Sequence, residues 1–221
     1  MLRGYKWYLK GMFPIPIMIV LFLLFTFFEI ILPKYEIDGI LSFFIFPLYI
    51  FFGVLHIIRP KDLTIMELSL IRDWLSIPIS KFLALLTWIL PFILLETGIM
   101  YYKHLTWLLL PLLILSINSI ILGLLFSLLN NKEASMILLI SFYFLIPIGI
   151  SILVGTLESL NVKSNLLIQF LTYYLDTLAG EDYYKSHLFT LSLLDFLPYI
   201  LVLDILFFFI YIITFIRGDY K

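Results

Sequence analysis

The sequence predicts an all-α integral membrane protein with six transmembrane helices, and two observations support this prediction. Hydrophobic residues make up 63% of the 221 residues, the mean hydropathy is +1.12, and charged residues make up 13%. Soluble domains contain about 25% charged residues, so this composition indicates that lipid forms part of the solvent. In addition, long apolar runs alternate with short polar or proline-containing segments, and about 20 consecutive apolar residues cross a bilayer as a helix.

The same composition excludes several classes of function. The chain has no cysteine, which rules out disulfides, thiolate metal sites and cysteine nucleophiles. A formal net charge of −1 argues against nucleic acid as a partner, because surfaces that bind nucleic acid carry an excess of basic residues. The sequence has no glycine-rich phosphate-binding loop, so ATP chemistry is expected only in a separate protein. The first apolar run is too long for the core of a signal peptide and is expected to be retained.

Residues 1–221 are expected to form a single transmembrane domain that begins on the membrane surface. Residues 1–11 interleave basic with aromatic side chains, as in helices that lie among lipid headgroups. Span 1 is expected from Phe13 to Leu32 and is closed by proline. Span 2 is expected from Ile40 to Ile58, with a kink at Pro47 because proline cannot donate a backbone hydrogen bond.

Four further spans follow after an intervening polar segment. Prolines inside the third and fifth apolar runs, Pro91 and Pro147, predict further kinks. A polar turn at 130–133 predicts that the fourth and fifth spans form an antiparallel hairpin. The expected spans are Phe82–Met100, Leu108–Leu129, Ala134–Leu157 and Phe196–Ile216.

The basic residues predict the orientation of these spans. Ten of the 14 basic residues lie on one side, namely Arg3, Lys6, Lys10, Arg59, Lys61, Arg72, Lys81, Lys132, Arg217 and Lys221. The other four, Lys34, Lys103, Lys163 and Lys185, lie on the opposite side. Cytoplasmic loops carry the excess of lysine and arginine, so we expect a multi-pass protein of the cell membrane with both termini in the cytoplasm.

Two segments between the spans are expected to form amphipathic helices. Residues 62–78, on the cytoplasmic side, place Leu63, Met66, Leu70, Ile71 and Trp74 on one helical face. Glu67 falls within that apolar face and needs a partner, because an unpaired buried charge is costly. Residues 158–195, on the outer side, repeat apolar residues at helical spacing from Leu166 to Leu178, with Ser164 or Asn165 as the N-cap and Gly180 as the stop. That helix is too short to span and is expected to dip into the outer leaflet or pack on the outer ends of the spans.

Polar residues inside the predicted spans are candidate site residues, because an ionisable group in hydrocarbon usually faces protein or water. Asp204 lies near the middle of span 6, and Asn118 lies at similar depth in span 4 as its possible partner. Glu29 and Glu96 lie toward the outer ends of spans 1 and 3 and are candidates for one acidic vestibule. These four residues either line a translocation path or act as polar contacts between helices. His56, His104 and His187 are isolated in the sequence, so neither a metal site nor a catalytic site is expected from them.

Two segments resemble parts of ABC-2-type transporter permeases. Glu67, then Trp74-Leu75-Ser76, then Pro78-Ile79-Ser80-Lys81 running into span 3 resembles the cytoplasmic coupling region of that family, although Leu68, Ser69 and Leu70 replace its usual basic residue, glycine and threonine. The sequence from Leu171 to Leu178, LTYYLDTL, resembles the family segment that follows the fifth span. Gln169 and Phe170 stand where that segment has a proline, and Ala179 and Gly180 replace its arginine.

The resemblance implies a permease subunit of an ATP-driven exporter that works as a homodimer or heterodimer. Its coupling residues would be Glu67, Leu70, Ile71, Trp74, Leu75 and Pro78, and they would dock on a separate ABC ATPase that binds ATP and Mg²⁺. The chain itself would then hold no cofactor and would not be an enzyme. Two alternatives stay open from the residues alone: an intramembrane enzyme that uses its embedded carboxyl groups on lipid or isoprenoid substrates, and a membrane scaffold that transports nothing.

Overall fold

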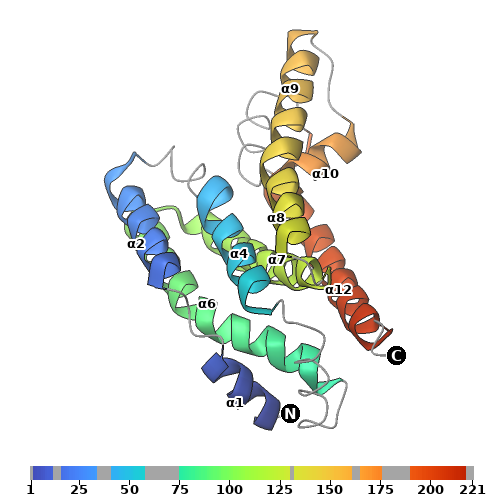
Figure 1. The fold of residues 1–221 in the computed structure, drawn as a ribbon. Coiled ribbons are helices and arrows are strands. Elements are labelled where there is room, and N and C mark those ends of the chain that lie inside the picture. Colours follow the sequence, from blue (N-terminus) through green and yellow to red (C-terminus); the bar gives the residue numbers. More distant parts are fainter. Residues whose placement is uncertain are drawn as a thin grey trace.

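The computed structural model describes residues 2–11, 16–33, 41–57, 75–129, 132–160, 165–175 and 190–217, and every element in these residues is helical (Figure 1). Within these described residues, three helical segments are long and apolar enough to cross a bilayer. They are α6 (Ser76–Tyr102), the 3₁₀ turn η3 (Thr106–Leu108) together with α7 (Leu109–Ser127), and α12 (Leu193–Arg217). These segments correspond to the predicted spans 3, 4 and 6.

The other predicted spans are shorter or interrupted in the residues that the structure describes. Span 1 corresponds to α2 (Pro16–Ile31), whose 16 residues extend about 24 Å, less than the hydrocarbon core of about 30 Å. Span 2 corresponds to the π-helical turn η2 (Leu41–Ile45) and α4 (Phe46–Ile57). Span 5 corresponds to α8 (Lys132–Ile140), the π turn η4 (Ser141–Leu145) and α9 (Ile146–Ser159). The number of spans beyond three therefore stays a prediction.

Each π turn ends two residues before a proline. The turn η2 precedes Pro47, and η4 precedes Pro147. A proline ring clashes with the carbonyl group four residues earlier and donates no hydrogen bond to it, and a local π turn relieves that clash by adding one residue to the turn. In contrast, α6 stays α-helical through Pro91.

Helix α7 forms the centre of the described structure and contacts α4, α6, α8 and α12. In its most apolar stretch 72% of the residues are buried, compared with 33% for α6 and 22% for α12. Small residues, Ser116, Ser119, Gly123 and Ser127, are buried along α7 and allow neighbouring helices to approach closely. The serine hydroxyls donate to backbone carbonyl groups three or four residues earlier, so they add no unsatisfied donor to the core.

The outer faces of the helices are apolar as well. Large apolar side chains are exposed along α2, α6 and α12, among them Phe27, Leu94, Val202 and Phe209. Soluble proteins seldom leave such long apolar faces open to water. Lipid or another apolar surface is therefore the environment that suits these faces.

The first helix, α1 (Leu2–Gly11), packs against the N-terminal half of α6. The Tyr5 hydroxyl lies 2.9 Å from Thr87 Oγ1, and the Trp88 indole nitrogen donates to the Leu9 carbonyl group at 2.9 Å. Lys81 of α6 is buried, and its amino group lies 5.4 Å from the ring centre of Tyr8 and 5.1 Å from that of Phe215 on α12. The start of α6 is thus joined to both α1 and α12.

The ends of the two longest helices are fixed by local hydrogen bonds. At the end of α6, the His104 amide donates to the Tyr101 carbonyl group and the Leu105 amide donates to that of Met100, which is the Schellman arrangement usually formed by glycine. His104 adopts a φ of 58° there. At the start of α12, Asp195 Oδ2 accepts from the amide and the hydroxyl of Ser192, as in a capping box.

Candidate functional site

A buried polar network joins α7, α10 (Leu166–Leu175) and α12 at the middle of the structure. The Asn118 side-chain amide donates to Asp204 Oδ1 at 2.7 Å and to the Tyr174 hydroxyl at 2.9 Å. Asn118 and Asp204 are each 2% exposed. Asp204 Oδ2 is buried and has no hydrogen-bond partner in the described part of the chain. The structure therefore brings together two predicted site residues and adds Tyr174, which the sequence analysis did not select.

Helix α10, which supplies Tyr174 to this network, is held by a cap at its N-terminus and by hydrogen bonds to the residues just before α12. Asn165 Oδ1 accepts from the Ile168 amide at 2.8 Å, which identifies Asn165 as the N-cap. The Tyr173 hydroxyl donates to the Leu191 carbonyl group at 2.9 Å, and the Gln169 side chain accepts from the Thr190 amide. Burial raises the pKa of Tyr174 above its ordinary value, so its hydroxyl stays protonated.

The position of Tyr174 shows how deep α10 lies. Asn118 and Asp204 occupy the middle of α7 and α12, and Tyr174 sits one residue before the end of α10. The C-terminal end of α10 therefore reaches the mid-length of both long helices. This segment belongs to the predicted outer amphipathic helix, whose stop at Gly180 lies outside the described residues.

A second polar cluster lies between α2 and α6. Glu29 and Glu96 are both fully buried, and their carboxyl groups lie close enough to interact with each other. The Thr26 hydroxyl lies 3.1 Å from Glu96 Oε1 and 2.9 Å from the Phe22 carbonyl oxygen, and can donate to either. The structure thus places the two predicted acids together, but inside the packed helices rather than on an open vestibule.

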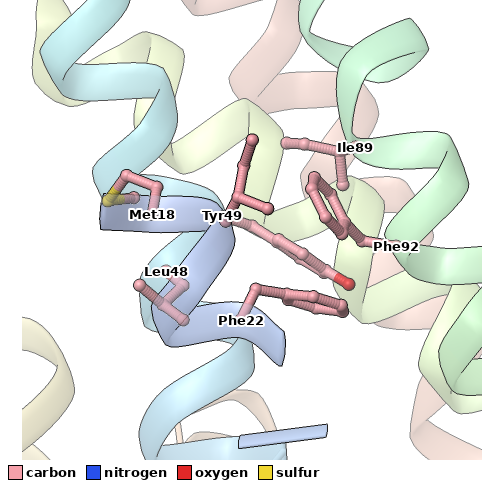
Figure 2. A pocket seen from close by; sticks show the side chains of 7 residues that line it. Met18, Phe22, Leu48, Tyr49, Ile89 and Phe92 are labelled. Carbon is pink, nitrogen blue, oxygen red and sulfur yellow. The ribbon is translucent and has the colours of Figure 1, made fainter. Parts of the chain in front are cut away.

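Tyr49 of α4 completes the surroundings of this cluster. It lines a narrow apolar hollow with Met18 and Phe22 of α2 and with Ile89 and Phe92 of α6. Figure 2 shows its hydroxyl pointing between the rings of Phe22 and Phe92. The hydroxyl is buried without a hydrogen-bond partner among the described residues.

The predicted coupling residues lie mostly outside the described residues. Glu67, Leu70, Ile71 and Trp74 belong to residues 58–74, which the structure does not describe. Leu75 is described and is 50% exposed, whereas Pro78 is buried in the first turn of α6. Proline is well tolerated in the first turn of a helix because the amide there has no partner inside the helix. Helix α6 therefore begins at Ser76, six residues before the predicted start of span 3.

No candidate metal centre is present in the described part of the chain, where no three histidine, aspartate or glutamate side chains come together. His104 serves as the turn residue at the end of α6. The side chain of His56 and all of His187 lie outside what is described. Of the described acids, Asp204 belongs to the first cluster above, and Glu29 and Glu96 form the second.

The sequence analysis did not select Thr26, Tyr49, Tyr174 or Lys103, although helical spacing held a signal for one of them. Thr26 precedes Glu29 by three residues and therefore shares its helix face. Lys103 donates to the carbonyl groups of Ile30 and Leu32 at 2.7 and 2.9 Å. It thereby places a cation at the C-terminal end of α2, where a positive charge is favourable.

Comparison of the chain with protein-family models, with curated proteins and with solved structures finds no match in any of the three. The resemblance to ABC-2-type permeases therefore stands on the two sequence segments alone.

Proposed function

We propose that this chain is the permease subunit of an ATP-driven exporter of ABC-2 type, which moves a substrate across the membrane using a separate ATPase. One observation carries the proposal: Glu67, Trp74-Leu75-Ser76 and Pro78-Ile79-Ser80-Lys81 lead directly into α6. The apolar composition and the three long apolar helices support a membrane location. The LTYYLDTL segment, whose first five residues form the end of α10, supports the same family.

In this proposal the ATPase acts on the chain through residues 62–78. Nucleotide binding would draw two ATPase subunits together, and each would push a coupling segment. A push there reaches α6 directly, since α6 starts at Ser76. Helix α6 contacts α1, α7 and α12, so its tilt would shift the packing of the central helix α7. Transport would then follow from a change in the balance between two packings, as for other ligand-driven transitions.

A second permease chain is part of this proposal, because ABC-2 permeases work in pairs. The exposed apolar faces of α2, α6 and α12 provide surface for such a partner as well as for lipid. The Asn118–Asp204–Tyr174 network would then be either an inter-helix contact or a polar part of the path. The substrate of the exporter is left open by the proposal.

Co-purification tests the proposal most directly. The tagged wild-type chain should retain an ABC ATPase when it is extracted in mild detergent. Trp74→Ala should weaken that association about 30-fold or more, and Glu67→Ala should weaken it as well. A buried aromatic anchor at an interface contributes about 2 kcal/mol or more, which corresponds to at least about a 30-fold change in affinity. Trp107→Ala and Glu133→Ala are matched controls, since both side chains are exposed and lie far from residues 62–78 in the sequence.

Two results would contradict the proposal. If no ATPase is retained by the wild-type chain, and both variants support growth and transport as the wild type does, the segment is an interfacial helix only. Conversion of a lipid or isoprenoid by the purified chain without ATP would favour the intramembrane enzyme instead.

A further inference from the structure

The pairing of α2 with α6 brings two carboxyl groups together inside an apolar interface. Met18, Phe22, Thr26 and Glu29 are the buried residues of α2 and lie on one helical face. Phe22 meets Phe92 with ring centres 4.3 Å apart, and Thr26 meets Glu96 one turn further along both helices. The two helices therefore run parallel, and Glu29 and Glu96 face each other near the end of the interface.

Two ionised carboxyl groups cannot hydrogen-bond to each other, because both are acceptors only. Neither oxygen of Glu29 nor Oε2 of Glu96 meets a donor in the described residues. Two buried negative charges in contact would repel each other strongly without water to screen them. A single proton shared by the pair removes one charge and supplies the missing donor.

No other charged group in the described residues offsets the repulsion between the two carboxyl groups. From α4, the titratable group that faces the pair is Tyr49, and η2 contributes none within Leu41–Ile45. Lys103, beyond the end of α6, is hydrogen-bonded to the carbonyl groups of Ile30 and Leu32. The other helices that contact α6 bring no further titratable group to the pair: α7 and η3 have none, while α1 and α12 meet α6 at its opposite half, around Lys81.

The Tyr49 hydroxyl is a further buried polar group beside the two carboxyl groups. It is 2% exposed, has no described hydrogen-bond partner and points between α2 and α6 (Figure 2). A buried hydroxyl of this kind normally has a partner. An ionised carboxyl group of the pair would be such a partner, because its oxygen can accept a hydrogen bond from the Tyr49 hydroxyl.

We propose that Glu29 and Glu96, assisted by Thr26 and Tyr49, form a proton-binding site that holds α2 against α6. While one proton is shared, the pair is joined by a hydrogen bond and carries one charge. When the proton leaves to solvent, two negative charges face each other and α2 separates from α6. The packing of α2 is then coupled to the pH on the side from which the proton exchanges. Proton binding by this pair requires neither transport nor the proposed ATPase.

The pH dependence of unfolding tests the site in the full-length chain. Because the proton stabilises the packed state, the wild-type melting temperature should be highest at low pH and should fall as the pH rises through the release of the proton. Glu29→Gln removes the shared proton, so the fall of the melting temperature that this pair causes should be absent from the variant, and its pH profile should be flatter than that of the wild type. Glu96→Gln should behave in the same way, and Glu29→Ala should lower the melting temperature at every pH.

Infrared difference spectroscopy reports the proton itself. The purified chain in detergent, compared between low and high pH, should show the carbonyl stretch of one protonated carboxyl group that Glu29→Gln and Glu96→Gln each abolish. Asp204→Asn is the matched control, since it changes a different buried carboxyl group and should leave this band. Tyr49→Phe should shift the pH at which the band is lost.

Three results would overturn the proposal. The first is a wild-type pH profile identical to that of Glu29→Gln, and the second is a band that survives both glutamine variants. The third is a shift of the pH at which the infrared band is lost when sodium chloride replaces choline chloride at constant ionic strength. Such a shift would identify the pair as a site for a metal cation rather than for a proton alone.

Discussion

The replacement of Asp204 by asparagine or by leucine separates a structural hydrogen bond from a functional charge. Asp204 Oδ1 accepts from Asn118 at 2.7 Å, and Asn118 also donates to Tyr174 at 2.9 Å. Asparagine keeps an oxygen in the accepting position and removes the charge. Leucine removes the acceptor and leaves one amide hydrogen of a buried side chain without its partner.

The expected magnitude follows from this single lost contact. Hydrogen bonds between helices in membranes contribute about 0.6 to 2 kcal/mol, and an unsatisfied buried donor costs about 1 to 3 kcal/mol. Asp204→Leu should therefore destabilise the fold by about 2 kcal/mol. Asp204→Asn should remain within about 0.5 kcal/mol of the wild type, because the same contact persists without an ionisable group in the interior.

Thermal and chemical unfolding of the purified chain in detergent, followed by circular dichroism, would measure this difference. Ile205→Ala is a matched control on the same helix. Because Ile205 is exposed, this substitution should leave the free energy of unfolding unchanged. Equal stability of the leucine variant and the wild type would refute the hydrogen-bond reading. If both variants fold and assemble but lose all activity equally, ionisation of Asp204 is the property that matters.

Four further predictions follow from the described contacts and the predicted topology. His104→Gly should stabilise the chain by about 0.5 to 1 kcal/mol relative to His104→Ala in unfolding assays, because glycine adopts the φ of 58° without steric cost. Lys81→Met should lower the free energy of unfolding by about 1 kcal/mol, whereas Lys81→Arg should retain much of it, because the amino group lies over the rings of Tyr8 and Phe215. Asp195→Ala should cost about 1 kcal/mol through the loss of the capping contact at the start of α12, and Asp195→Asn should cost less. Reporter fusions at Lys132 and at the C-terminus should both report the cytoplasmic side, and an external signal from either would rule out the six-span topology.

The sequence by itself determined the helical class and the positions of the long apolar helices. The apolar runs that predict spans 3, 4 and 6 lie in α6, α7 and α12, because length and hydropathy depend on local residues only. The apolar residues that recur at helical spacing from Leu166 begin α10, and Asn165 is its N-cap; the location of this helix on the outer side stays a prediction. Helix ends were less predictable. Helix α6 begins at Ser76 and not at Phe82, since proline can enter a first turn.

The tertiary structure decided which polar residues meet. The spacing along the chain gives the depth of Asp204 and Asn118, but their hydrogen bond requires α12 to pack on α7 with one particular rotation. The same holds for Glu29 and Glu96, whose contact depends on the parallel packing of α2 and α6. Tyr174 and Tyr49 gain their places from α10 and α4, and no local pattern distinguishes them from other tyrosines.

The tertiary structure also decided which apolar helix is central. Helices α7 and α12 have almost equal hydropathy, 2.5 and 2.6, yet 72% of the first stretch is buried and 22% of the second. The hydrophobic effect provides no distinction between them, because lipid tails and a packed protein interior are both apolar. Close packing decides the matter: the small residues of α7 admit four neighbouring helices, whereas α12 presents large side chains such as Phe209 and Ile213 to the outside.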